Sequence, residues 1–145
     1  MGRRAVLTAF LVPLVAGAQA PESETDSQSA AARAVLGHIA DALAAGNSSD
    51  AMTPFDTSFP KYATLNDYFS GLISAFYLSN EIEVLDEEDG ARETKLTVRW
   101  ALTLTNRQTY YTENRSAELK VQIVRKVAKW KIVALEPISL FDPGR

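Results

Sequence analysis

Hydrophobic residues recur along this chain with two different periods, and the period changes close to Leu78. Before that point, two sets of apolar side chains recur at three- and four-residue intervals, as they do on one face of an α-helix. The first set is Ala32, Val35, Leu36, Ile39 and Leu43, and the second is Leu65, Tyr68, Phe69, Leu72, Ile73 and Phe76. We therefore predict a helix from Ala31 to Gly46, followed by a short helical turn. A second long helix should run to about Leu78, with Thr64 and Asp67 as its capping box.

After Leu78, apolar and polar residues alternate, which is typical of β-strands with one buried face. The segments TKLTVRWALTLT, SAELKVQIV and WKIVALEP carry this pattern, and turn signals such as Asp89-Gly90 separate the strands. The acidic run from Asp86 to Asp89 is expected in a solvated turn. The inner-face positions are Leu96, Val98, Trp100, Leu102, Leu104, Ala117, Leu119, Val121, Ile123, Trp130, Ile132 and Ala134. Helices followed by an antiparallel meander of about four strands predict an α+β fold.

The N-terminal segment MGRRAVLTAFLVPLVAGAQA has two arginines, then an apolar run, then small residues, which is the order of a secretory signal peptide. The apolar run from Ala5 to Gly17 is shorter than the roughly 20 residues needed to cross a bilayer. We therefore expect no membrane span after leader removal. We predict a signal peptide over residues 1–18, a flexible acidic leader over 19–30 and one folded domain over 31–142, located outside the cell or in the periplasm.

The composition argues against several kinds of partner and cofactor. The chain has no cysteine, which excludes disulfides and thiolate metal sites. It has 15 basic and 18 acidic residues, and loss of Arg3 and Arg4 with the leader would make it more acidic, so we expect no nucleic-acid partner. The single histidine, His38, lies on the flank of the first helix, where a solvent or carbonyl partner is expected. We assign no metal and no cofactor.

The order of elements, ending in VRKVAKWKIVALEP, resembles the nuclear transport factor 2-like superfamily, whose members have a cystatin-like fold. The charged turn followed by Trp130-Lys131-Ile132 is similar to the closing strand of these proteins, and ADALAAGNSSDAMTPFD is similar to their first helix and the turn after it. The resemblance covers about Ala31 to Phe141. It implies a cone-shaped, curved antiparallel sheet wrapped on N-terminal helices. The superfamily includes isomerases, cyclases, dehydratases and transport adaptors, so the fold does not choose a reaction.

Enzymes of this superfamily carry an acid or a histidine inside the cone, where apolar surroundings raise the pKa of a carboxyl group. None of the inner-face residues predicted above can transfer a proton. Glu136 precedes Pro137 at a strand end, where we expect a solvated carboxylate. Asp56 and Asp67 are expected to form a turn and a helix cap. We assign no catalytic residue.

The large apolar residues of the inner face predict a mostly filled cone with at most a small apolar pocket near Trp100. Any ligand should then be apolar and neutral. The residues expected to line this pocket are Tyr68, Leu72, Trp100, Leu102, Leu119 and Val121. On the opposite, polar face we expect a weak homodimer contact. Its apolar residues are Ala101, Val124, Val133 and Leu135.

These patterns predict a secreted or periplasmic, non-catalytic binding or interaction domain. Two alternatives stay open. One is an enzyme similar to ketosteroid isomerases or polyketide cyclases, acting on a small apolar substrate with acids supplied by loops. The other is a structural subunit of an envelope complex. A carboxyl group with a raised pKa inside the cone would favour the enzyme.

Overall fold

The chain folds as helices followed by an antiparallel sheet and a short 3₁₀ helix, so the predicted α+β order is confirmed. The structure, a computed structural model, describes residues 24–144. Its helices are α2 (Glu24–Ala44), α3 (Ser48–Met52) and α4 (Tyr62–Ala75). Its strands are β1 (Phe76–Asp89), β2 (Glu93–Asn106), β3 (Thr112–Lys126) and β4 (Lys129–Glu136), and the 3₁₀ helix η1 (Ile138–Phe141) follows.

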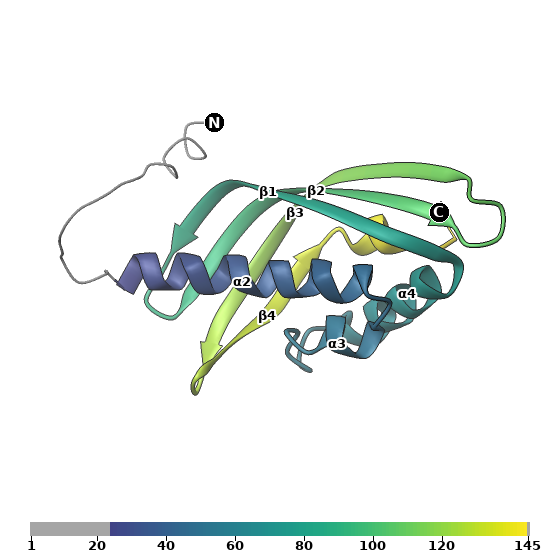
Figure 1. Ribbon diagram of the computed structural model, residues 1–145. Coiled ribbons are helices and arrows are strands. Elements are labelled where there is room, and N and C mark those ends of the chain that lie inside the picture. Colours follow the sequence, from purple (N-terminus) through teal and green to yellow (C-terminus); the bar gives the residue numbers. More distant parts are fainter. Residues whose placement is uncertain (1–23, 145) are drawn as a thin grey trace.

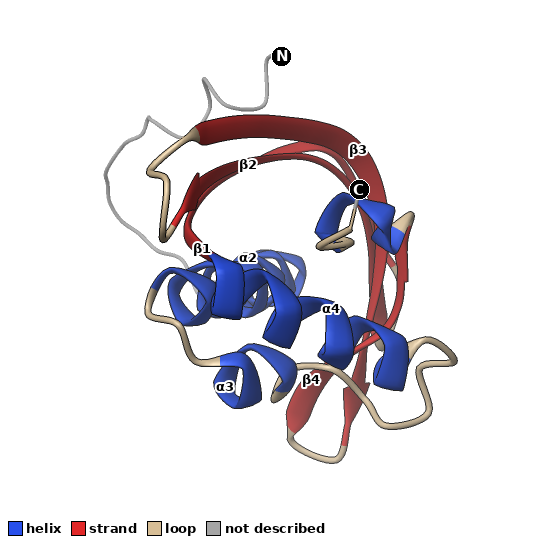
Figure 2. Cartoon of the chain, turned by 90° about the vertical axis from the view of Figure 1, so that its right-hand side faces the viewer, coloured by secondary structure: helices blue, strands red, loops and turns tan. Residues whose placement is uncertain are grey.

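The sheet curves around the helices. Helix α2 runs across one side of the sheet (Figure 1), and β2 and β3 arch over α2, α4 and the C-terminal turn (Figure 2). The strand order is β1-β2-β3-β4, and all neighbours are antiparallel. Long strands twist and coil together, so one face of the sheet becomes concave and the other convex. We call the concave, helix-covered side the inner face and the opposite side the outer face.

The alternation predicted for β2 is confirmed. Its inner-face residues, from Leu96 to Leu104, are buried, while the residues between them point outward. Leu119, Val121 and Ile123 of β3 are buried in the same way. Leu36 and Ile39 of α2, and Phe69 and Leu72 of α4, close the core from the helical side. The inner face therefore packs as a continuous hydrophobic core.

The C-terminal segment closes the cone at its remaining open side. Ile138, Leu140 and Phe141 of η1 are all buried. The Phe141 ring packs edge-on against Phe69, with centroids 5.2 Å apart, and against Trp100, with centroids 5.3 Å apart. Edge-to-face contacts of this kind add to the free energy gained by burial. The end of the chain thus contributes side chains to the centre of the core.

Strand β4 differs from the prediction at two positions because of a β-bulge. Opposite Gln122 and Ile123 the pairing shifts by one residue, so that Val133 has no partner. A bulge of one residue moves the following side chains to the other face. Leu135 is therefore buried in the core and Ala134 faces outward, the reverse of the expected arrangement.

Helix α2 begins at Glu24, before the predicted start at Ala31, so part of the expected flexible leader is helical. The physical reason is a tertiary contact. The buried Gln28 side chain donates hydrogen bonds from Nε2 to the carbonyl oxygens of Gly90 and Glu93 and to Thr94 Oγ1, at 2.8–3.0 Å. These bonds hold the first turns of α2 on the β1–β2 hairpin. No helix within residues 24–144 is long and apolar enough to cross a membrane.

The boundaries around α4 also differ from the prediction. The helix begins at Tyr62 with Lys61 at its N-cap and no side-chain capping bond, so the predicted Thr64–Asp67 capping box is wrong. It ends at Ala75, because Phe76 pairs with Asn106 and starts β1. The whole acidic run, residues 86–89, lies inside β1 rather than in a turn. Strand pairing with β2 overrides the local signals at both ends of β1.

Candidate functional site

Most of the residues predicted to line a pocket lie in the packed core. Leu72, Trp100, Leu102 and Leu119 have no exposed surface, and Val121 is 2% exposed. Tyr68 is half-buried at the edge, where it lines a surface cavity between α4 and the end of β4. The structure thus gathers five of these side chains inside the cone and places Tyr68 at its rim.

The polar group next to Trp100 is Asn80 of β1, which the sequence prediction did not single out. Trp100 Nε1 donates a hydrogen bond to Asn80 Oδ1 at 2.8 Å, and Asn80 Nδ2 donates to the carbonyl oxygen of Ala40 at 3.3 Å. An amide does not titrate, so this pair positions side chains and cannot act as an acid or a base. The available signal was the phase of Asn80 with Leu78 and Ile82 in β1.

Arg115 is the second polar residue on the inner face that the prediction missed. Its side chain is only 3% exposed, and Nε donates to Glu113 Oε2 at 2.9 Å. Its Nη1 donates to the carbonyl oxygens of Leu140 and Asp142 at 2.9 and 2.8 Å. Charged hydrogen bonds of this kind are stronger than neutral ones, so Arg115 fastens the C-terminal segment to β3. Its phase with Ala117 and Leu119 was the sequence signal.

The acids considered at the sequence level lie outside the cone. Glu136 is exposed on the outer face, and Asp67 is exposed on α4. Asp56 accepts hydrogen bonds from Ser58 and from Lys126, and these bonds lower the pKa of Asp56 to about 2. A carboxyl group with so low a pKa is ionised at neutral pH and is a poor general acid. The prediction that Asp56 forms a turn is confirmed.

His38 has the carbonyl partner expected for it. Its Nε2 lies 3.2 Å from the carbonyl oxygen of Asp50, 3.2 Å from Asp50 Oδ1 and 3.3 Å from Thr53 Oγ1. These contacts join α2 to α3 at an exposed position. Within the described part of the chain, no group of three or more histidine or acidic side chains is placed to hold a metal ion.

Glu87 is a carboxyl group whose pKa is raised, and it lies where the N-terminal turns of α2 meet β1. Burial is the main cause, and the neighbouring Asp89 carboxyl adds to it. Ser29 and Arg33 donate hydrogen bonds to Glu87 Oε1 at 3.0 and 3.1 Å, which opposes the shift, while Oε2 is buried without a partner. Glu87 is thus engaged with α2, at one end of the sheet, and does not line either cavity described below.

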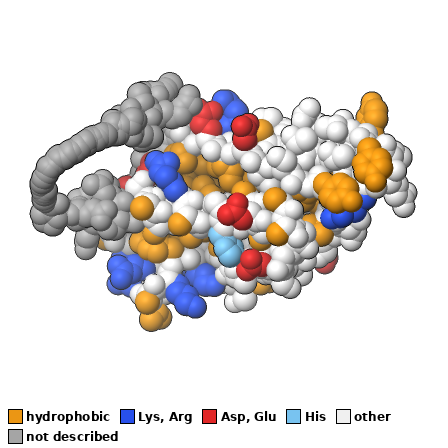
Figure 3. Space-filling model, in the orientation of Figure 1, with side chains coloured by type: hydrophobic (Ala, Val, Ile, Leu, Met, Phe, Trp, Pro, Cys, Tyr) orange, Lys and Arg blue, Asp and Glu red, His pale blue; other side chains and the backbone are white. Residues whose placement is uncertain are grey.

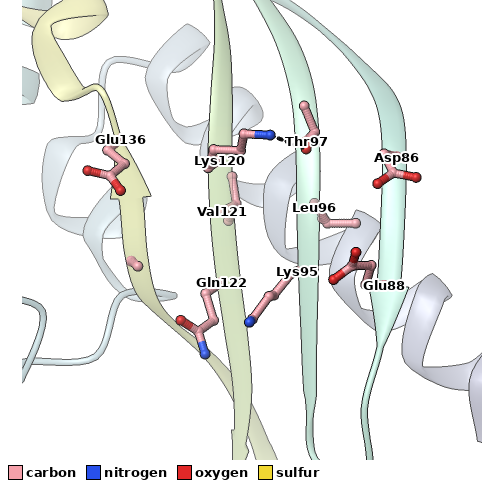
Figure 4. A pocket seen from close by; sticks show the side chains of 10 residues that line it. Asp86, Glu88, Lys95, Leu96, Thr97, Lys120, Val121, Gln122 and Glu136 are labelled. Atoms are coloured by element: carbon pink, nitrogen blue, oxygen red, sulfur yellow. Dashed lines mark hydrogen bonds between the residues drawn. The ribbon is translucent and has the colours of Figure 1, made fainter.

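The described residues line two surface cavities on and beside the outer face. The first, of about 260 Å³, is a shallow depression across all four strands, where Lys95 and Lys120 lie among Asp86, Glu88 and Glu136 (Figure 4). In it, Lys120 Nζ donates to Thr97 Oγ1 at 3.1 Å. The second, of about 600 Å³, adjoins it near Tyr68 and Pro137. Mixed charges at open positions like these are well solvated and mostly cancel.

Solved structures with the same fold come from several bacteria. One is a nuclear transport factor 2-like superfamily protein from Salmonella enterica serovar Typhimurium, with a TM-score of 0.62 and 7% identity over 77% of this chain and 89% of that one. Another is a protein of unknown function with a cystatin-like fold from Nostoc punctiforme, with a TM-score of 0.59 and 14% identity over 78% and 90%. The predicted nuclear transport factor 2-like, cystatin-like fold is confirmed.

A third similar structure is described as a candidate dehydratase of the nuclear transport factor 2-like family from Streptomyces avermitilis. Its TM-score is 0.66, with 7% identity over 76% of this chain and 94% of that one. No protein-family model matches the sequence, and no curated protein matches it significantly. At these identities the similarity concerns the fold alone, which supports many functions.

Proposed function

We propose that this protein is a non-catalytic binding or interaction domain that works outside the cytoplasm. The observation that carries the proposal is the filled cone, in which Phe141 packs between Phe69 and Trp100. Near this cluster, Asn80 is bonded to Trp100 and Ala40, and Arg115 is bonded through Nε and Nη1, while its Nη2 is buried without a partner. A guanidinium and an amide do not act as a general base. A proton-transfer site needs both space for substrate and a titratable group facing it.

A ligand of the cone, if one enters, should be small, apolar and neutral. The predicted lining residues Leu72, Leu102 and Leu119 offer only hydrocarbon surface, so a polar ligand would lose its hydration without compensation. The ligand must also displace well-packed side chains, because protein cores have few voids larger than a water molecule.

The two tryptophans provide a direct test of this proposal. Trp100 is buried in the cone and Trp130 is partly exposed near the β3–β4 turn, so their indole N–H resonances report on two separate places. In ¹H–¹⁵N spectra, a panel of polar metabolites should leave the Trp100 signal in place, and sterols, quinones or fatty acids should be the compounds that move it. A polar or charged metabolite that moves the Trp100 signal and spares Trp130 would contradict the proposal.

Export is proposed from the N-terminal pattern, and cleavage is proposed within two residues of Ala18. This segment lies outside the described residues 24–144. The intact mass of the protein collected from the periplasm or the medium tests it. A mass that still includes residues 1–17 would rule out the signal peptide.

Weak homodimerisation through the outer face also stays a proposal. Ala101, Val124 and Val133 remain partly exposed there, whereas Leu135 belongs to the core and is withdrawn from this surface. A dimer formed by the remaining apolar residues would have a smaller contact than predicted. A sedimentation-velocity series up to high micromolar concentration should show a concentration-dependent increase in the sedimentation coefficient, and a constant monomer value would end the proposal.

An enzyme is the second candidate, and the raised pKa of Glu87 is the observation that favours it. Perturbed carboxyl groups gather at active sites, although structural contacts perturb them as well. Here Glu87 Oε1 is occupied by Ser29 and Arg33. A metabolite that shifts the Glu87 side-chain carboxyl resonance in a titration would support catalysis, whereas a response to pH alone would support a structural role.

A further inference from the structure

Exposed tyrosines gather at the end of the sheet formed by the β2–β3 hairpin. Tyr77, Tyr110 and Tyr111 are 51%, 68% and 78% exposed. Within residues 28–144, one other large hydrophobic residue is as strongly exposed, Val127, and it lies in the distant β3–β4 turn. Hydrophobic side chains stand out together at the right-hand end of the molecule, beside a basic group (Figure 3). Single exposed apolar residues need no explanation, but a group on one surface commonly marks a contact site.

The hairpin holds two of these rings in a defined place. The backbone N–H of Tyr110 donates a hydrogen bond to the carbonyl oxygen of Asn106, and the backbone N–H of Asn106 donates one to the carbonyl oxygen of Tyr111, both at 2.8 Å. Asn106 Oδ1 also accepts bonds from the backbone N–H groups of Gln108 and Thr109. Tyr110 has a φ of 62°, in the left-handed region that a bulky residue rarely adopts. Glycine or asparagine would fit this turn with less strain, so the ring is present at a cost in backbone energy.

The third ring is fixed by a cation. The Arg107 guanidinium carbon lies 4.2 Å from the centre of the Tyr77 ring, and Arg107 Nε donates to the carbonyl oxygen of Ile73 at 2.9 Å. The cation–π contact orients Tyr77, and the guanidinium keeps its positive charge beside the ring. The ring nevertheless remains half exposed, so its outer surface is free for a ligand.

The strand surface next to the tyrosines carries hydroxyl and amide groups and no formal charge. Two cross-strand rows run from the Tyr77 end, Tyr77–Thr105–Thr112 and then Ser79–Thr103–Asn114. Thr103 Oγ1 donates to Asn114 Oδ1 at 3.0 Å, and the Thr105 and Thr112 hydroxyls lie 3.4 Å apart. Hydroxyl and amide groups can both donate and accept, and each keeps spare capacity beyond these bonds. The charged residues of the outer face begin with Glu81, in the next row.

We propose that this surface, Tyr77, Tyr110 and Tyr111 with Thr103, Thr105, Thr112 and Asn114, is a binding site for a neutral carbohydrate. A sugar ring presents apolar C–H groups on its faces and hydroxyls around its rim. The tyrosine rings suit the faces, because an aromatic ring carries negative charge on its π surface and attracts C–H hydrogens. The hydroxyl and amide rows suit the rim, where each partner both gives and accepts hydrogen bonds.

The charge of this surface indicates which class of ligand it can bind. The two strand rows carry no formal charge and Arg107 is a single cation, whereas anionic polymers and membranes are bound by clustered cations, so the surface favours an uncharged ligand. Tyrosines are also common anchors at protein–protein interfaces, so the rings by themselves do not choose the occupant. The threonine and asparagine rows beside them favour the carbohydrate, because serine and threonine are under-represented among such anchors, whereas hydroxyl and amide groups suit the rim of a sugar. The inference extends the proposed binding function, but the site is separate from the cone. A failure here would leave the Trp100 test of the cone untouched.

The experiment measures retention of the protein on insoluble cellulose and its titration with soluble mannan and β-glucan. Alginate and heparin are the acidic controls. The double variant Tyr110→Asn, Tyr111→Ser removes two rings and introduces residues that are common in turns. The matched control is Val127→Asn, which changes an exposed hydrophobic residue in the β3–β4 hairpin. We expect binding to a neutral polysaccharide, weakened at least about tenfold in the double variant and unchanged in Val127→Asn.

A thermal melt distinguishes loss of the site from loss of the fold, because the double variant should melt at or above the parent midpoint once the strained Tyr110 is gone. The variant Tyr111→Phe, which keeps the ring, should retain most of the binding. Absence of binding to all the neutral polysaccharides, equal binding by the double variant, or preference for alginate or heparin would each overturn the proposal. Binding only to a protein partner would overturn it as well.

Discussion

The two faces of the sheet are built from the same strands, yet they differ in burial and in the kinds of side chain they carry. On the inner face, Trp100 and its neighbours in β2 have almost no exposed surface, because the helices and η1 cover the inner-face residues of that strand. On the outer face the same strands present threonines, charged residues and open cavities. Alternation in a strand separates two chemical environments only a few ångströms apart. Packing therefore governs the inner face, and solvent and ligands govern the outer one.

The outer face is itself divided along the strands. The end near the β2–β3 hairpin carries tyrosines and hydroxyl groups, and the opposite end carries Lys95, Lys120 and several acids around the shallow cavity. Alternating charges keep an open sheet face hydrated and discourage edge and face association. Stability therefore comes from the inner face, and the proposed recognition site lies at the end of the outer face that has no acids and no lysines on its two strand rows.

The largest effect is expected for Trp100→Ala on the inner face. The change removes the contact with Phe141 and leaves Asn80 Oδ1 without its donor, so the free energy of unfolding should fall by about 3–5 kcal/mol. Tyr111→Ala, on the exposed hairpin, should change it by no more than about 0.5 kcal/mol. Urea denaturation measures both. Similar values for the two variants would contradict the distinction between the faces.

The next effect tests the β-bulge in β4. Leu135→Ala should cost about 2–5 kcal/mol because Leu135 is buried, and Val133→Ala should cost under about 1 kcal/mol because Val133 is partly exposed at the bulge. The same denaturation assay applies. If Val133→Ala were the more damaging change, the strand would have the simple alternation predicted from sequence, and the faces of β4 would have to be exchanged.

A smaller effect on stability is expected at Glu87, an ionisable residue of β1 that contacts α2. Burial raises the pKa of Glu87, so the native state holds this proton more tightly than the unfolded chain does, and ionisation costs stability as pH rises from 4.5 through the raised pKa. Glu87→Gln removes that cost and can still accept bonds from Ser29 and Arg33. We expect the variant to be more stable than the parent at pH 7, and the difference to disappear below about pH 4.

Melting temperatures across this pH range provide the measurement for Glu87. Glu88→Gln, on the exposed outer face of the same strand, controls for the loss of one negative charge. Equal pH profiles for the two variants would show that Glu87 is not perturbed by its contact with α2. A Glu87→Gln variant less stable than the parent at pH 7 would show that the ion pair with Arg33 outweighs burial.

The smallest effect is expected on the outer face, at the cross-strand pair Thr103 and Asn114. A double-mutant cycle with Thr103→Ala and Asn114→Ala should give a coupling of about 0.2–1 kcal/mol, the range of exposed cross-strand pairs. A coupling above about 2 kcal/mol would mean that the hydroxyl row is part of the stabilising structure. In that case its role in ligand binding would need independent support.

Local pattern was sufficient for the order of elements, the α+β class and the inner face of β2, and the resemblance to a known superfamily supplied the cone-shaped fold. It did not predict the start of α2, because Gln28 finds its hydrogen-bond partners more than sixty residues away. It also placed the end of α4 too late, because a strand pairing with Asn106 competes with the helix at Phe76. Contacts that are distant in sequence decided each of these boundaries.

The candidate sites were predicted less well than the fold. The apolar lining of the cone could be listed from alternation, but Asn80 and Arg115 were missed although both are in phase with inner-face residues. A polar residue at such a position is ambiguous until its partners are known, since burial is acceptable only when hydrogen bonds compensate for lost hydration. Arg115 finds its acceptors at Leu140 and Asp142, and only the folded chain brings them together.

The sequence by itself determined which residues can be buried, because the spacing of apolar side chains is a property of each helix and strand. The tertiary structure decided what those residues enclose. Only folding brings Phe141 between Phe69 and Trp100, shifts Leu135 to the inner face through a bulge, and collects three tyrosines at one end of the sheet. The reason is that a cavity, a bulge and a surface patch are relations between distant segments, and no local period encodes them.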